Sequence, residues 1–269
     1  MNAKHIGHPF VTVGDGTRIA YRVDGPADRP ALLLANSIGT DLHMWDGQIA
    51  ALSEHFHVIR YDMRGHGRSD VPPGAYSLDR LGRDAVELLD ALGIDCAHVV
   101  GLSLGGFVGQ WLGIHAPERV DRLVLSHTAA YLGPPGQWDE AIAAVLRAPD
   151  MSGTTEMFLR NWFPAAWVEG SSPLVEPFRR TLLNTDPRGL AGAWSAVRDT
   201  DMRRTIALIA RPTLVIAGRN DTVTSPRHSE EIAGTVPGAK LVVLPAVHLS
   251  NVECPEAFLS AVVGFLHQS

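Results

Sequence analysis

The stretch His98-Val99-Val100-Gly101-Leu102-Ser103-Leu104-Gly105 decides the fold of this chain. A short apolar strand that runs directly into Gly-x-Ser-x-Gly is typical of a nucleophile elbow, the turn that presents a catalytic serine. The positions on either side of that serine lie too close to neighbouring backbone for a side chain, so Gly101 and Gly105 are the residues that fit. The apolar stretch from Phe107 to Ile114 supplies the helix that should follow. Ser103 is therefore the predicted nucleophile.

Strands and helices alternate on both sides of the elbow. Apolar runs predict strands at residues 10–13, 18–23, 31–35, 57–61, 98–100, 123–126, 213–217 and 241–244. Helical spacing predicts helices at 42–52, 78–92, 107–114, 229–233 and 255–266, and Ser77 is the expected N-cap of the second. Unbroken apolar strands that alternate with helices predict an α/β fold, with a mostly parallel eight-stranded sheet covered on both faces.

The alternation stops between about Tyr131 and Ile209, where the pattern indicates helices and loops but no strand. Four of the six tryptophans and six of the eighteen prolines fall in this segment. We therefore expect residues 1–130 and 210–269 to form one α/β core domain. Residues 131–209 should form a helical cap inserted in that core.

Composition excludes several classes of function. With 45% hydrophobic and 19% charged residues, the 269-residue chain can bury a large core. Its net charge of −6, without any run of Lys or Arg, argues against a nucleic-acid partner.

Cysteine content and the N-terminus bear on location. Cys96 and Cys254 cannot build a disulfide framework, and their spacing suits neither a zinc site nor a redox pair. The start, Met1 to His5, carries no apolar signal region, and no segment reaches the roughly 18 apolar residues that a membrane-spanning helix needs. We expect a cytoplasmic protein with no membrane partner.

A serine hydroxyl needs a base to remove its proton and an acid to orient that base. In a fold of this kind the two follow late strands, in the order acid and then histidine. Asp221 follows the strand at 213–217, and His248 follows the strand at 241–244. We predict that these two residues complete a catalytic triad. Asp199 and Asp201 are poorer candidates for the acid because they lie in the cap segment.

The oxyanion of the reaction needs two preorganised N–H donors. One is the amide of Leu104, which follows the nucleophile, and the other should come from the loop after the third strand. We choose Ile38 within that loop, Asn36-Ser37-Ile38-Gly39-Thr40. The side chain of Asn36 or Ser37 should either brace the loop or touch the substrate.

Other polar residues carry weaker signals. The glycine-rich run Arg64-Gly65-His66-Gly67-Arg68-Ser69 follows a strand and is more typical of architecture than of chemistry. His43, His115 and His127 are expected to be packing or surface residues, although His127 ends a strand near the predicted site. No cluster of histidines and carboxylates has the spacing of metal ligands, so no metal is predicted.

These features together resemble a known family. The elbow, the run from Arg64 to Ser69 and the late Asp and His resemble the α/β-hydrolase fold over almost the whole chain. Asn36-Ser37-Ile38-Gly39-Thr40-Asp41-Leu42-His43-Met44-Trp45-Asp46 is similar to the corresponding stretch of the 3-oxoadipate enol-lactonases of bacterial aromatic catabolism. Most relatives carry His-Gly where this chain has Asn36-Ser37. Trp162-Phe163-Pro164 and His248-Leu249-Ser250-Asn251-Val252-Glu253 also resemble that family.

The resemblance implies hydrolysis of a small enol-lactone that bears a carboxylate. It implies Ser103, Asp221 and His248 as the triad, with the oxyanion held by the amides of Ile38 and Leu104. Trp138 and Trp162 are the cap residues expected nearest the substrate, although tryptophans in such a segment more often belong to a core. Arginines of the cap are candidates to pair with the substrate carboxylate, namely Arg147, Arg160 and Arg198.

The sequence leaves rival functions open. The same triad would serve a general short-chain esterase, a cofactor-free perhydrolase or a carbon–carbon bond hydrolase. A dehalogenase is disfavoured because that chemistry needs a carboxylate at position 103. A non-catalytic small-molecule receptor of the same fold is the rival from another class. The proposed steps need no cofactor.

Overall fold

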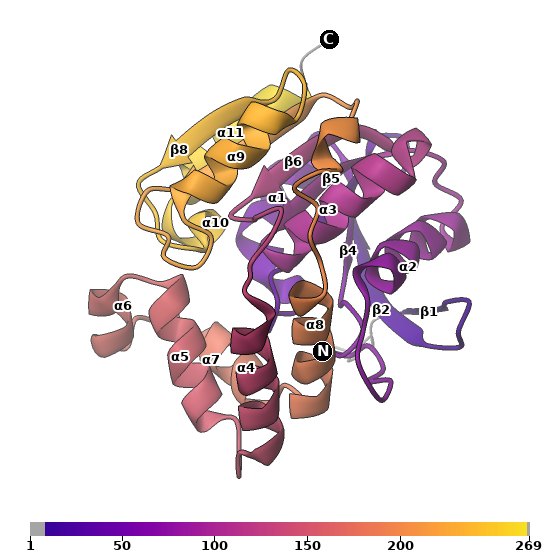
Figure 1. Cartoon of the computed structure of the whole chain (residues 1–269). Helices are drawn as coiled ribbons and strands as arrows, with labels where there is room; N and C mark the ends of the chain where they lie inside the picture. The colour runs from indigo at the N-terminus through magenta and orange to yellow at the C-terminus, as the bar shows by residue number, and fades with distance from the viewer. Residues whose placement is uncertain (1–8, 268–269) are drawn as a thin grey trace, which may run out of the picture.

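An eight-stranded sheet forms the centre of the protein in a computed structural model that describes residues 9–267 (Figure 1). The segment from Met1 to His5, expected to lack a signal region, falls outside the described residues. The strands are β1 (Phe10–Thr12), β2 (Arg18–Asp24), β3 (Ala31–Ala35), β4 (His57–Tyr61), β5 (Ala97–Leu102), β6 (Val120–Ser126), β7 (Thr213–Gly218) and β8 (Lys240–Leu244).

The strand order is β1-β2-β4-β3-β5-β6-β7-β8. β1 and β2 are antiparallel to each other, and β2 is antiparallel to β4, whereas every later pairing is parallel. The predicted mostly parallel sheet is therefore confirmed. Because β3, β5, β6, β7 and β8 run in one direction, the loops that follow them gather at one edge of the sheet, where ligands bind in such folds.

Helices cover both faces of this sheet, which is why every residue of β5 and β7 is buried. α2 (Leu78–Ala91) packs against α3 (Leu104–His115), whereas α1 (Asp46–Ser53) packs against α11 (Pro255–Leu266). None of the helices within residues 9–267 has the length and apolar character to cross a membrane. The core helices are η1 (Leu42–Trp45), α1 (Asp46–Ser53), α2 (Leu78–Ala91), α3 (Leu104–His115), η2 (Pro117–Arg119), η3 (Ile206–Leu208), α9 (Pro226–Thr235), α10 (Ser250–Glu253) and α11 (Pro255–Leu266).

The helix ends follow local signals. The predicted N-cap is confirmed at Ser77, whose hydroxyl accepts a hydrogen bond from the amide of Arg80. The helix expected at 42–52 is divided into η1 and α1, because the Asp41 side chain caps a short 3₁₀ turn first. β6 begins three residues earlier than predicted, because Val120 pairs with Ala97 of β5 despite the polar residues that follow it. Tertiary pairing there overrides the apolar pattern.

Between β6 and β7 the chain forms five α-helices and, within this fully described segment, no strand. Figure 1 shows these helices gathered beyond one end of the sheet. A single bridge between Tyr131 and Asp201 joins the two ends of the segment. The helices are α4 (Pro135–Arg147), α5 (Ser152–Trp162), α6 (Ala165–Glu169), α7 (Glu176–Leu183) and α8 (Pro187–Arg198).

The glycine-rich loop after β4 has an architectural role. The buried guanidinium of Arg64 donates hydrogen bonds of 2.6 and 2.7 Å to the two carboxylate oxygens of Asp84. Gly65 has a φ of +79°, and a Cβ there would lie 2.8 Å from the Cα of Gly189 in α8. The loop thus lets α8 approach the core closely, and the buried imidazole of His66 faces the carbonyl of Arg64.

Candidate active site

Ser103 occupies the sharp turn between β5 and α3, with φ of +58° and ψ of −115°. This left-handed backbone is uncommon for a residue with a side chain and is a feature of functional sites. A Cβ at Gly101 would lie 2.1 Å from the carbonyl oxygen of Gly105, and one at Gly105 would lie 2.0 Å from that of Ala35. Both contacts are impossible, so the turn requires glycine at each position.

Asp221 and His248 are brought together by the loops after β7 and β8. Both side chains are buried, and Nδ1–H of His248 donates a 2.8 Å hydrogen bond to Oδ2 of Asp221. The amides of Val223 and Thr224 donate to Oδ1 at 2.9 and 3.0 Å, and the hydroxyl of Thr224 donates to Oδ2 at 2.8 Å. These bonds hold the carboxylate in one orientation.

The charge state of Asp221 follows from competing effects. Burial alone would raise the pKa of its carboxyl, but the charge of His248 and hydrogen bonds from His127 and His248 outweigh burial. The pKa of the Asp221 carboxyl therefore lies well below its usual range. An ionised Asp221 only accepts hydrogen bonds, so Nδ1 of His248 must carry the proton and Nε2 is free to act as a base.

A cavity of about 460 Å³ lies against these groups, between the sheet edge and helices α4, α5 and α8. Ser103 and His248 both line it, as do Ile38 and Leu104. Leu104 is the first residue of α3, so its amide has no acceptor within that helix. The cavity therefore brings a hydroxyl, an imidazole and a helix N-terminal amide to one small space.

Aromatic side chains form much of the opposite wall. Trp138 and Trp162 line the cavity, and so does Trp194, whereas Trp167 does not. The rings of Phe158 and Trp194 stack with centroids 5.9 Å apart. The carbonyl oxygen of Trp162 accepts a hydrogen bond of 3.2 Å from the amide of His248, which joins α5 to the loop after β8. This aromatic part of the wall is apolar, and Trp162 joins it to the loop that carries the imidazole of His248.

The loop after β3 is braced by one of its own side chains. Asn36 is buried, donates 2.8 Å to the carbonyl of Tyr61 and accepts 2.8 Å from the indole of Trp45. Of the two roles expected for these residues, the hydrogen bonds of Asn36 favour bracing, whereas the buried Ser37 hydroxyl has no hydrogen-bond partner; neither residue lines the cavity. Because both ends of the Asn36 amide are occupied, the side chain fixes the position of Ile38 instead.

Comparison with known proteins identifies the family. The model of the alpha/beta hydrolase fold family matches residues 30–255. This chain belongs to the α/β-hydrolase fold family. It is 40% identical to 3-oxoadipate enol-lactonase 2 of Acinetobacter baylyi over 90% of both chains. Among solved structures, it is similar to a hydrolase from Pseudomonas aeruginosa, with 60% identity and a TM-score of 0.97 over 99% of this chain and all of that one. It is also similar to the enol-lactonase from Burkholderia xenovorans, with 38% identity and a TM-score of 0.94 over 97% and 100%.

The arginines expected to pair with a substrate carboxylate do not reach the cavity of this α/β hydrolase. Arg147, Arg160 and Arg198 are absent from its wall, and Arg198 instead pairs with Asp139 and Asp199. No Arg or Lys is found among the described residues that line the cavity. Long basic side chains on helices are usually solvated or paired with neighbouring carboxylates, as Arg198 is here.

A histidine that sequence reasoning did not select does line the cavity. His228 lies in the first turn of α9, and its Nδ1 is 3.2 Å from the hydroxyl of Ser225. Its ring forms part of the cavity wall beside Thr222 and Val223. The available signal was its position shortly after Asp221, in the loop and helix that follow β7.

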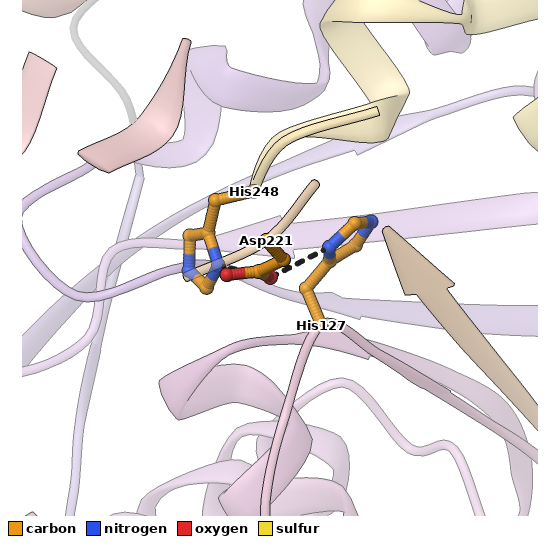
Figure 2. Close-up of side chains that lie close together, drawn as sticks. All are labelled: His127, Asp221 and His248. Carbon is orange, nitrogen blue, oxygen red and sulfur yellow. Dashed lines mark hydrogen bonds and ion pairs between the residues drawn. The ribbon is translucent and has the colours of Figure 1, made fainter. Parts of the chain in front are cut away.

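His127, which we expect to be a packing or surface residue at the end of a strand near the site, is buried and contacts the predicted acid. Figure 2 shows His127 and His248 approaching Asp221 from opposite sides. Nδ1–H of His127 donates a 3.0 Å hydrogen bond to Oδ2 of Asp221, and the His127 side chain has no exposed surface. The rival acids behave differently, because Asp199 pairs with Arg198 and Asp201 pairs with Arg203.

The cluster of His127, Asp221 and His248 also has the proximity of a metal site. One ligand atom from each residue lies within 4.8 Å of the others. Both histidines use Nδ1 to hydrogen-bond the same carboxylate oxygen, so hydrogen bonding alone accounts for their arrangement. The absence of a metal stays a prediction.

Proposed function

We propose that this protein is a carboxylic ester hydrolase that opens 3-oxoadipate enol-lactone to 3-oxoadipate. The observation that carries the proposal is that Ser103 and His248 line one cavity while His248 is hydrogen-bonded to Asp221. The choice of lactone rests on the similarity to 3-oxoadipate enol-lactonases over 90% of the chain. A cavity of about 460 Å³ with a largely aromatic wall suits a compact ring better than a long acyl chain.

In the first half of the reaction, Ser103 Oγ attacks the lactone carbonyl while Nε2 of His248 takes the hydroxyl proton. Asp221 holds the imidazole and stabilises its cation. The amides of Ile38 and Leu104 donate to the oxyanion. The carbon–oxygen bond of the ring breaks, His248 protonates the departing enol oxygen, and the enol tautomerises to the 3-oxo group.

In the second half, a water molecule hydrolyses the acyl-enzyme. His248 takes a proton from the water as it attacks the acyl carbon, and then returns a proton to Ser103 Oγ as the acid is released. Residues 131–209 act as a cap that closes the cavity, with Trp138 and Trp162 as its substrate wall. Exclusion of bulk water by this wall strengthens the hydrogen bonds to the oxyanion.

We also propose where in the cell the protein acts. Cys96 and Cys254 are both free, which fits a reducing compartment, and we place the protein in the cytoplasm.

The function predicts a strong preference for the lactone. We expect kcat/KM of about 10⁴ M⁻¹s⁻¹ or more on 3-oxoadipate enol-lactone, well above the value for a neutral short-chain p-nitrophenyl ester. Steady-state kinetics of both substrates measure the ratio. A weak lactone rate beside a faster ester rate would contradict the lactonase function and leave a general esterase. Absence of turnover with tight ligand retention would favour a small-molecule receptor.

His228 is our candidate partner for the substrate carboxylate, because no arginine or lysine among the described residues lines the cavity. An imidazolium there would supply the missing positive charge, so His228→Gln should raise KM for the anionic lactone by roughly tenfold. The neutral ester should be affected less. The comparison is KM for both substrates in His228→Gln and in Gln137→Ala, a second polar wall position. Equal losses on the two substrates would rule out a charge-specific role.

A further inference from the structure

We propose that His127 is a second imidazole on the catalytic acid, a positioning residue held by Ser250 in the tautomer that donates to Asp221. This inference rests on the proposed function, since it gives Asp221 the role of the acid. His127 does not line the cavity and therefore touches no substrate. Its hydrogen bond to the catalytic groups goes to the carboxylate of Asp221, and its ring also packs edge-on against His248 with centroids 5.7 Å apart.

The tautomer follows from the partners at the two ring nitrogens. Nδ1 of His127 lies 3.0 Å from Oδ2 of Asp221, which is ionised and can only accept, so Nδ1 carries a proton. Nε2 lies 2.7 Å from the hydroxyl of Ser250. In a neutral ring this nitrogen must accept, so Ser250 donates to it. The chain of hydrogen bonds then runs from Ser250 through His127 to Asp221.

Burial keeps this ring neutral. His127 has no exposed surface, and desolvation lowers the pKa of its imidazole despite the neighbouring carboxylate. Two ionisable groups of the described chain act on it, namely Asp221 after β7 and His248 after β8. The first favours a charge on the ring and the second opposes it. A neutral His127 can thus donate one fixed hydrogen bond without competing for the negative charge as an ion pair would.

The imidazole of His127 is tightly packed at the end of β6. His127 adopts a φ of +45°, a strained conformation for a residue with a side chain, while its amide donates 2.8 Å to the carbonyl of Ile216. A Cβ at Gly218 would lie 2.7 Å from Cε1 of His127. Ser250 is fully buried in the first turn of α10. Three separate elements therefore fix one imidazole against Asp221.

The extra donor has a chemical consequence. Oδ2 of Asp221 accepts from His248, His127 and Thr224, so its negative charge is shared among three hydrogen bonds. Such a carboxylate is held still, and it is a weaker base than one bonded to His248 alone. Loss of the His127 donor should leave Asp221 more basic and should stabilise the protonated form of the catalytic imidazole.

The kinetic test is the pH profile of kcat/KM for wild type, His127→Phe and His127→Asn, on both the lactone and the p-nitrophenyl ester. Removal of the donor in His127→Phe should move the acid limb to higher pH by on the order of half a unit to one unit. His127→Asn, whose amide can still donate to Asp221, should restore the limb toward wild type. A uniform loss of activity with an unchanged limb in His127→Phe would overturn the inference and leave a packing role.

A second measurement tests the inference even if the His127 variants do not fold. It is made on the wild-type protein and does not require turnover. Ring-nitrogen NMR of the wild-type protein should show His127 protonated at Nδ1 only, at neutral and alkaline pH, and Ser250→Ala should disturb that signal. A ring that is protonated at Nε2, or that titrates within this range, would overturn the inference. Failure of the proposed function would appear separately, as lactone and ester rates that Ser103→Ala does not reduce.

Discussion

Replacing Ser103 with alanine should reduce kcat on the lactone by about 10⁴- to 10⁶-fold, because the reaction loses its nucleophile. The folded structure should persist. The backbone of residue 103 is held by hydrogen bonds of its own, from its amide to the carbonyl of Ser126 and to its carbonyl from the hydroxyl of Thr128. Alanine adopts a φ of +58° at the same cost as serine. Single-turnover kinetics and the thermal midpoint measure the two effects.

Ser53→Ala is the matched control for this substitution. Ser53 ends α1, does not line the cavity, and its hydroxyl is buried without a hydrogen-bond partner in the described structure. We expect its kcat to equal that of wild type. If Ser103→Ala retained more than about a hundredth of wild-type turnover, the acyl-enzyme mechanism would be wrong, since oxyanion stabilisation alone preserves far less.

Asp221→Asn should lower kcat by about 10⁴-fold. This loss is larger than removal of the negative charge of residue 221 alone would cause. Both oxygens of the carboxylate accept hydrogen bonds, Oδ1 from the amides of Val223 and Thr224, and Oδ2 from His127 and His248. The NH₂ group of an asparagine would have to face either the two backbone amides or the two imidazoles. All of these groups are themselves hydrogen-bond donors. The side chain then either loses its loop anchors or forces His248 into the tautomer that cannot act as base. The pH profile of kcat and the free energy of unfolding, measured in urea, test both consequences.

Asp199→Asn provides the control for that experiment. Asp199 is one of the poorer candidates for the catalytic acid. Its carboxylate pairs with Arg198 at the exposed end of α8. We expect wild-type kcat and a change in stability of less than about 1 kcal/mol, as is usual for an exposed ion pair. If Asp199→Asn lost as much activity as Asp221→Asn, the acid would have to be sought in the cap segment.

Local sequence was sufficient to predict the elbow and most of the sheet. Gly101 is required by a contact with the backbone of Gly105, four residues further along the chain, whereas Gly105 is required by the carbonyl of Ala35 at the end of β3. Buried strands such as β5 and β7 are short apolar runs, and the predicted N-cap at Ser77 depends on a bond to Arg80 only three residues away. The Gly101 contact, the apolar runs of these strands and the Ser77 cap are each set by residues close together in the chain.

What tertiary structure alone decided are the contacts between segments far apart in sequence. His127 meets Asp221 because β6 and β7 pair side by side, a neighbour relation that no local pattern contains. The side-chain amide of Asn36 forms hydrogen bonds with the carbonyl of Tyr61 and the indole of Trp45. It therefore braces the loop instead of facing the cavity. The sequence predicts where polar groups lie along the chain, but the competition among distant partners for each hydrogen bond is resolved only when the sheet and the helices pack together.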